Sequence, residues 1–149
     1  MDDTDRRILR ILQADCSAPV SEVARQVGLS ASPCWKRINR LQESGVIREQ
    51  VAVLEPEALG YGLTVFMSIS TGEHSGEWLR NFAEFVSAMP EVQEFHRMAG
   101  EIDYMLKVVV ADMKAFDAFY KRLVDTTPLT EVTSRFSMET IKQTTALPV

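Results

Sequence analysis

The sequence predicts an α+β protein in which a small all-helical domain precedes a domain that combines a sheet with two helices. Apolar residues recur at helical spacing from Ile8 to Leu41, and from Leu63 the apolar period changes to two. A chain of 149 residues that is 46% hydrophobic has room for two small cores. The boundary is expected near Pro56, which gives domains of residues 1–55 and 56–149.

The first domain is expected to contain three helices. Thr4 can cap the first helix and Ser21 the second, because their side-chain oxygens accept from free backbone N–H groups. Gly28 ends the second helix, and Ser30 or Ser32 can cap the third. Two short helices that meet at a glycine are typical of a helix-turn-helix.

The third predicted helix has two unlike faces. Cys34, Ile38 and Leu41 fall at i, i+4 and i+7, so they share a face that is expected to be buried. The opposite face is polar and basic, which suits DNA phosphates and base edges, although a solvated helix of a small bundle is the alternative. The candidate DNA-binding residues are Ser21, Ser30, Ser32, Pro33, Trp35, Lys36, Arg37, Asn39 and Arg40.

The net charge of −5 is unevenly distributed along the chain. Residues 1–50 hold eight Lys/Arg and seven Asp/Glu, a net +1, while residues 51–149 hold eight and fourteen, a net −6. Around the third helix the only acidic residue is Glu43, so the local net charge is +3. The four basic residues are Lys36, Arg37, Arg40 and Arg48. A patch this small binds DNA weakly by itself, so several copies acting together are expected.

The β-branched run from Val46 to Leu54, after Gly45, predicts an extended segment in the position of a wing or a connecting strand. It has no Asn-Gly or Asp-Gly turn, so a two-stranded wing is left open. The later periodicities predict a ferredoxin-like βαββαβ order, with both helices on one face of an antiparallel sheet. The expected strands are 63–70, 92–99, 104–110 and 132–138, and the expected helices are 78–89 and 113–124, the latter burying Met113, Phe116, Tyr120 and Leu123.

The second face of this sheet predicts self-association. If Val65 and Met67 pack on the helices, Phe66 points outward, together with one of two alternating apolar sets on the third strand. These sets are Met105 with Val109, or Leu106 with Val108. The resulting patch would be too large for a soluble monomer, which favours a homodimer; scattered surface apolar residues are the alternative.

Several other classes of protein are disfavoured. No run of about 18 apolar residues exists and the chain begins with acidic residues, so we expect a cytoplasmic protein with no membrane partner. The two cysteines form no CxxC pair and have no histidine cluster nearby, so neither a metal site nor a cofactor is expected. Cys34 is expected in the core, whereas a redox role for Cys16 is left open.

Over essentially its whole length, the chain resembles the Lrp/AsnC (leucine-responsive regulator, or feast/famine) family of transcriptional regulators. The matching motifs are Asp5-Arg6-Arg7-Ile8-Leu9, Gly28-Leu29-Ser30, Ser32-Pro33-Cys34-Trp35-Lys36-Arg37, Gly45-Val46-Ile47, Gly100-Glu101-Ile102-Asp103-Tyr104, and Ile141-Lys142 with Thr144-Thr145. The resemblance implies a helix-turn-helix that reads the major groove of double-stranded DNA. It also implies a ferredoxin-like part that binds a small effector, usually an amino acid, and assembles dimers into larger rings, with an octamer expected. Trp35 departs from this resemblance, because many relatives carry a smaller aliphatic residue at the corresponding position.

The resemblance also places an effector loop at residues 100–104, with the last strand close to it. An amino acid needs a negative group near its ammonium and N–H donors near its carboxylate, which Asp103 and the backbone at Gly100 can supply. Tyr104 could close one side, although an ordinary hairpin turn is the alternative. The candidate effector-binding residues are Met98, Gly100, Glu101, Asp103, Tyr104, Ser134 and Phe136.

Two other functions are alternatives to transcriptional regulation. A small enzyme could use His96 and Glu94, which share a strand face, with Glu101 and Asp103, but no nucleophile with an adjacent base is evident, so we predict no catalytic residues. An effector-binding assembly module whose helical domain no longer reads DNA is the other alternative.

Overall fold

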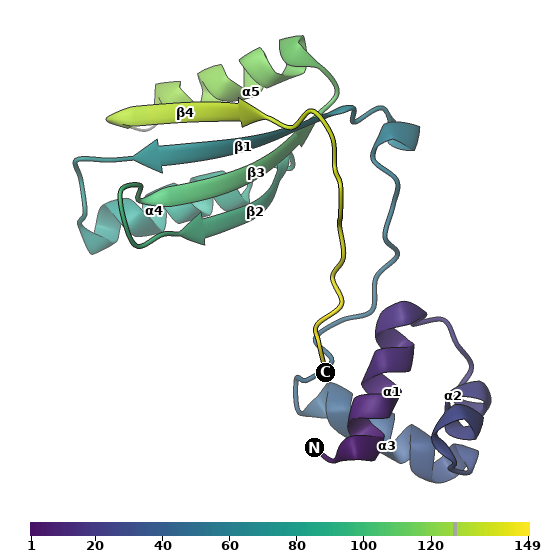
Figure 1. Ribbon diagram of the computed structural model, residues 1–149. Helices are drawn as coiled ribbons and strands as arrows, with labels where there is room; N and C mark the ends of the chain where they lie inside the picture. Colours follow the sequence, from purple (N-terminus) through teal and green to yellow (C-terminus); the bar gives the residue numbers. More distant parts are fainter. Residues whose placement is uncertain (127) are drawn as a thin grey trace. The chain divides into compact units, whose positions relative to one another are not determined.

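The computed structural model describes residues 1–126 and 128–149, and these divide into two compact units. The first, called the head here, comprises Met1–Val53 and Ile141–Val149; the second, the sheet unit, comprises Leu54–Thr140. The C-terminal segment therefore belongs to the head, which the sequence did not indicate. The elements in chain order (Figure 1) are α1 (Asp3–Ala14), α2 (Val20–Val27), α3 (Ala31–Glu43), the 3₁₀ turn η1 (Glu57–Leu59), β1 (Leu63–Ser70), α4 (Gly76–Ser87), β2 (Val92–Arg97), β3 (Tyr104–Val110), α5 (Met113–Thr126) and β4 (Glu131–Phe136).

The head is a three-helix unit around a core of aliphatic side chains. The predicted stripe of α3 is buried, and it packs with apolar residues of α1 and α2. Gly28 ends α2 at a φ of 75°, a left-handed conformation that favours glycine, and so makes the turn into α3. The core residues are Ile8, Leu9, Val23, Ala24, Val27, Cys34, Ile38 and Leu41.

The predicted helix caps in the head need correction. Asp2, not Thr4, caps α1, because its carboxylate accepts from the Asp5 N–H while the Asp5 carboxylate accepts from the Asp2 N–H. Helix α2 begins at Val20 after Pro19, so Ser21 lies within the helix and does not cap it. Ser30 occupies the N-cap position of α3 without a side-chain hydrogen bond to the backbone.

The segment after α3 forms neither a wing nor a strand. Residues 46–54, all of which the structure describes, belong to no helix or strand. The β-branched side chains predicted an extended segment, but a strand also needs a partner that pairs with its backbone groups, and residues 46–54 form no such ladder with the described residues. Val51, Val53 and Leu54 consequently stay exposed.

The sheet unit has the predicted βαββαβ order. Its four strands lie in the order β2-β3-β1-β4, and every neighbouring pair is antiparallel. Helices α4 and α5 cover the same face (Figure 1), where Phe82 and Phe119 pack on Val65, Met67 and Leu106. The prediction that Met113 is buried is wrong: it is 57% exposed at the first position of α5, and Phe119 fills the core instead.

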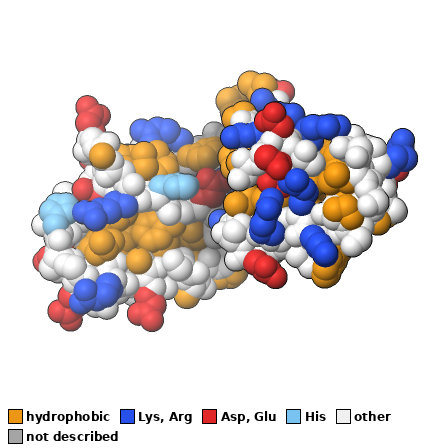
Figure 2. All heavy atoms as spheres, turned by 90° about the horizontal axis from the view of Figure 1, so that it is seen from below, with side chains coloured by type: hydrophobic (Ala, Val, Ile, Leu, Met, Phe, Trp, Pro, Cys, Tyr) orange, Lys and Arg blue, Asp and Glu red, His pale blue; other side chains and the backbone are white. Residues whose placement is uncertain are grey.

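The sheet face turned away from the helices, called the open face here, is less apolar than the sequence predicted. Leu106 and Val108 pack inward, which leaves the alternate residues of β3 on the open face. The strand register there aligns one residue from each strand, Glu94, Lys107, Phe66 and Arg135, in a single row. Figure 2 shows the sheet unit, recognisable by its pale blue histidines, with a continuous apolar area that is bordered by charged side chains. The open face is therefore mixed rather than uniformly apolar.

Candidate functional site

The outer face of α3 is open to solvent, as predicted. Ser32, Trp35 and Lys36 are exposed on the side of the helix opposite the buried stripe, and Asn39 is half-buried. Trp35 is 53% exposed, which is unusual for so large an aromatic side chain. Lys36 enters no ion pair with any described residue. A single helix thus presents a stacking surface, a cation and hydrogen-bonding groups together.

Two of the predicted DNA-binding arginines are instead held by carboxylates of α1. Arg37 Nη1 lies 2.7 Å from Asp2 Oδ2 and 2.8 Å from Asp5 Oδ1. Arg40 Nη2 lies 2.9 Å and 2.8 Å from the two carboxylate oxygens of Asp5. The Asp5 side chain is 1% exposed, so its charge is buried and needs these partners. This cluster of Asp2, Asp5, Arg37 and Arg40, called the Asp5 cluster here, ties α3 to α1.

The Asp5 cluster favours ionised carboxylates. The backbone N–H of Asp5, followed by the Arg37 guanidinium, lowers the pKa of Asp2 from 3.8 to about 2. Burial raises the pKa of Asp5, but the Asp2 N–H and the two arginines outweigh it, and the net shift is downward. Sequence reasoning missed this cluster because α1 and α3 are far apart in the chain; the acidic residues opening α1 were its only signal.

The predicted cationic patch is therefore weaker than its residue count suggested. Asp2 and Asp5 compensate Arg37 and Arg40, and Arg48 lies 3.1 Å from the Glu49 carboxylate. In Figure 2, the part of the molecule without histidines shows Lys and Arg interspersed with Asp and Glu. Lys36 is then the residue of the patch whose charge is least compensated.

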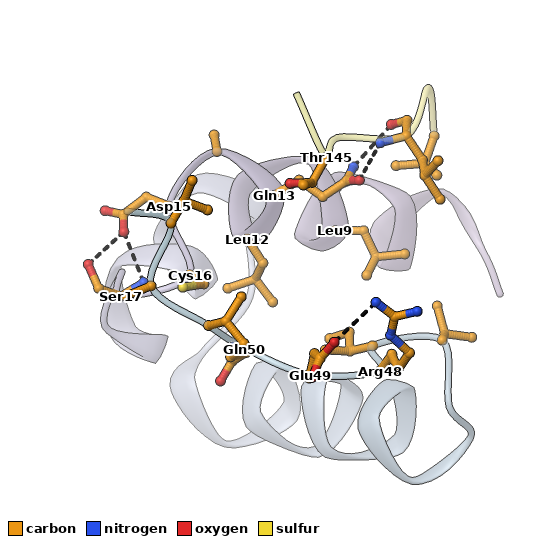
Figure 3. Close-up of a pocket in the computed structure, with 18 residues that line it drawn as sticks. Leu9, Leu12, Gln13, Asp15, Cys16, Ser17, Arg48, Glu49, Gln50 and Thr145 are labelled. Carbon is orange, nitrogen blue, oxygen red and sulfur yellow. Dashed lines mark hydrogen bonds and ion pairs between the residues drawn. The ribbon is translucent and has the colours of Figure 1, made fainter. Parts of the chain in front are cut away.

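The head also contains a groove that the sequence did not predict. It has a volume of about 830 Å³ and lies between α1, residues 46–53 and the C-terminal segment (Figure 3). The Gln13 side chain accepts from the Leu147 N–H and donates to the Leu147 carbonyl, and Arg10 Nε donates to the Val149 carbonyl. The C-terminal segment thus docks on α1 and closes one side of the groove.

The predicted effector loop is a tight turn at one end of the sheet. Gly100 takes a φ of 133°, which favours glycine, and the Met98 N–H donates to the Asp103 carbonyl across the turn at 2.8 Å. The Asp103 N–H donates to the Ile69 carbonyl, and its Oδ2 accepts from the Thr71 N–H at 2.8 Å. Asp103 therefore fastens the turn to the end of β1, and its Oδ1 accepts from none of the described residues.

The structure does not bring the remaining effector candidates to this turn within one chain. The Tyr104 ring is buried against Phe82 and Phe95 on the helix side, so it does not close a pocket at the turn. Ser134 pairs with Met67, and Phe136 packs edge-on against Phe116. Phe136 lies four strand residues beyond Val132, the β4 residue level with Tyr104 in the sheet, or about 13 Å along the strand.

The groups considered for an enzyme do not assemble into a catalytic or metal site. His96 Nε2 lies 3.2 Å from Glu94 Oε2, and Lys107 lies 3.5 Å from the same carboxylate. The His96 hydrogen bond lowers the pKa of Glu94, with a smaller contribution from Lys107. Among the described residues, no group of three His, Cys, Asp or Glu could hold a metal ion, and no helix is long and apolar enough to cross a membrane. Burial raises the pKa of the Cys34 thiol, whereas Cys16 is exposed.

Comparison with known families identifies both units. Residues 1–42 match the AsnC-type helix-turn-helix domain, and residues 64–147 match the Lrp/AsnC ligand binding domain. The chain belongs to the Lrp/AsnC family. It is a DNA-binding transcriptional regulator and not an enzyme, which confirms the fold class and the function that the sequence predicted.

Relatives in this family align with the whole chain. The DNA-binding transcriptional activator DecR of Escherichia coli K12 is 51% identical, covering 100% of this chain and 99% of DecR. An AsnC family transcriptional regulator from Agrobacterium tumefaciens has a TM-score of 0.97 at 53% identity, covering 99% of this chain and 97% of that one. A transcriptional regulator from Neisseria meningitidis, solved as an L-Met complex, has a TM-score of 0.95 at 34% identity, covering 99% and 96%.

Proposed function

We propose that this Lrp/AsnC regulator reads specific duplex DNA with the outer face of α3 and that an amino acid modulates this binding. The observation that supports DNA reading is the exposed face of α3, where Lys36 and Trp35 lie opposite the buried stripe. Lys36 supplies a phosphate contact, while Ser32 and Asn39 supply groups that can bond base edges. Such a regulator works on chromosomal DNA, so we expect it in the cytoplasm.

The turn at Gly100–Asp103 is the proposed effector site. Asp103 offers a carboxylate oxygen for an ammonium group, and the exposed backbone near Gly100 offers N–H donors for a carboxylate. The relative from Neisseria meningitidis supports an amino acid, since it was solved with L-Met. Because Phe136 lies about 13 Å from the turn along its strand, we propose that Ser134 and Phe136 act from a second copy of the chain.

Self-association through the open face of the sheet is a separate part of the proposal. Phe66 is 41% exposed there, in a row that also contains Glu94, Lys107 and Arg135. A two-fold interface would bury Phe66 and let the charges of one copy meet opposite charges of the other. We propose dimers of this kind, assembled further into an octamer, which places several heads on DNA at half-sites about 34–36 Å apart.

The DNA-reading part is tested with the Lys36→Ala variant. Removing one phosphate contact is expected to lower DNA affinity and to reduce the slope of log affinity against log salt by about 1. Lys121→Ala removes the same charge from the exposed face of α5 and serves as the control. An unchanged salt slope for Lys36→Ala would instead favour an assembly module whose head does not read DNA.

The effector part is tested by thermal denaturation in the presence of each of the twenty amino acids. A ligand at about 100 times its dissociation constant stabilises the folded state by about 2.7 kcal/mol, which shifts the transition visibly. We expect at least one amino acid to do so and also to change DNA affinity. If none shifts the transition, the proposed effector class is wrong.

The proposed interface is tested with Phe66→Glu. A charge in the centre of the open face is expected to shift sedimentation toward monomer. Met138→Glu, at a fully exposed position outside the sheet, is the control and should leave the assembly unchanged. Equal sedimentation of both variants and the unmodified protein would exclude the open face as the interface.

A further inference from the structure

The Asp5 cluster contains a buried carboxylate that completes the cap of α1 and also contacts two arginines of α3. Asp5 is fully buried on α1, and burying a carboxylate is unfavourable unless cations and N–H donors surround it. The partners it has, Arg37 and Arg40, both come from the helix that faces DNA.

The two arginines are held in different ways. Arg37 is 28% exposed and uses one nitrogen to bridge the Asp2 and Asp5 carboxylates, so its role is to join α3 to α1. Arg40 is 59% exposed and contacts Asp5 through Nη2 alone. Nη2 carries two N–H groups, and the one that does not point at Asp5 forms a parallel pair with an N–H of Nη1 or of Nε, so one such pair of Arg40 remains for another acceptor. Among the described residues, no carboxylate accepts from this pair.

The geometry points to Asp5 as a positioning residue for DNA reading, an inference that rests on the proposed function. We propose that Asp5 fixes the plane of the Arg40 guanidinium so that its remaining N–H groups meet the O6 and N7 acceptors of a guanine. A bidentate contact from arginine to these two guanine atoms is the most common specific contact between proteins and DNA bases. A guanidinium already held in one plane loses less conformational freedom on binding than a free side chain does.

The sign of the effect separates this role from a purely electrostatic one. Asp5 carries a negative charge beside a surface that approaches phosphates. If it contributed only that charge, its removal would strengthen binding to every duplex, specific or not. If it positions Arg40, its removal weakens binding to the selected sequence while binding to unrelated DNA stays equal or becomes stronger.

The experiment begins with a duplex selected from a random-sequence pool by the unmodified protein, and a scrambled duplex of the same composition. Affinities for both are measured for the unmodified protein and for Asp5→Asn, Arg40→Ala and the double variant, each shown to be folded by circular dichroism. Asp3→Asn, which removes an exposed charge from the same turn of α1, is the matched control.

We expect Asp5→Asn and Arg40→Ala each to lower the ratio of selected to scrambled affinity by roughly 5- to 150-fold, the range of one bidentate base contact. The double variant should lose little more than Arg40→Ala alone, because Asp5 acts through Arg40. Asp3→Asn should leave the ratio unchanged. An unchanged ratio for Asp5→Asn, or additive losses in the double variant, would overturn the proposal.

A second variant covers the case in which Asp5→Asn does not fold. Arg40→Lys keeps the charge but lacks the planar fork, so it should retain scrambled binding and lose the selected preference. If Arg40→Lys keeps that preference, the positioning role is wrong. If the unmodified protein selects no sequence from the pool, the proposed function itself fails, an outcome distinct from the failure of Asp5 alone.

Discussion

Among the described residues, the buried core of the head contains no aromatic ring, whereas that of the sheet unit contains four: Phe82, Tyr104, Phe116 and Phe119. Aromatic side chains bury large apolar areas, so the sheet unit is held mainly by packing. The head supplements small aliphatic residues with polar ties, namely the Asp5 cluster and the bonds between Gln13 and Leu147. The DNA-binding unit is therefore stabilised in part by charges near its binding surface.

The largest expected effect is the loss of an aromatic core residue. Phe82→Ala should lower the free energy of unfolding of the sheet unit by about 3–5 kcal/mol, because Phe82 is 2% exposed and stacks on Trp78. Amide hydrogen exchange, followed by mass spectrometry, resolves the two units. Met138→Ala, at a fully exposed position of the same unit, is the control. Equal loss of protection in the head would show that the units do not unfold separately.

Acid should act more strongly on the head. The pKa of Asp2 is lowered from 3.8 to about 2 and that of Asp5 is also lowered, so both carboxyls bind protons more readily in the unfolded chain. Their stabilisation is complete above pH 3.8 and is lost as the pH falls toward 2. Urea unfolding between pH 5 and pH 2, with hydrogen exchange to assign the unit, measures it. A head that keeps its protection at pH 2 would contradict the role of the Asp5 cluster.

A smaller effect is expected at the turn between α2 and α3. Gly28→Ala should destabilise the head by about 1–2 kcal/mol, because a side chain at a φ of 75° is strained although no atom lies within 4 Å of the added Cβ. Gly72→Ala is the control in the sheet unit, since its Cβ would make only an ordinary 3.6 Å contact with Thr130. Thermal unfolding measures both. Equal losses would mean that backbone strain at Gly28 is not the cause.

The smallest effect is expected on the surface of the head. Glu22→Gln removes an ion pair with Arg25 on exposed α2, which should cost no more than about 0.5 kcal/mol. A loss this small in the free energy of unfolding would distinguish an exposed ion pair from the buried Asp5 cluster of the same unit. A loss as large as that of Gly28→Ala would remove the distinction. Chemical denaturation at neutral pH measures it.

The elements followed from the sequence where one local signal sufficed. The helical spacing of Cys34, Ile38 and Leu41 and the period-two pattern from Leu63 predicted buried faces that the structure contains. The first residue of each helix was less predictable. Several polar residues precede each helix, and the backbone geometry decides which of them occupies the N-cap position. Asp2 and Pro19 took the positions expected for Thr4 and Ser21.

The candidate sites were predictable as surfaces but not as contacts. Which face of α3 is exposed followed from periodicity, yet the pairing of Arg37 and Arg40 with Asp5 joins residues more than 30 positions apart. Similarly, the turn at Gly100 was evident in the sequence, while the burial of Tyr104 depended on which side of β3 the helices cover.

The two units, the order of their elements and the family of the chain followed from periodicity, glycine positions and short motifs, because these are local properties of the sequence. Tertiary structure alone decided which charges are compensated, which face of the sheet remains open, and that the last nine residues pack on the head. These depend on distances between segments remote in the chain, and such distances exist only once the cores have formed.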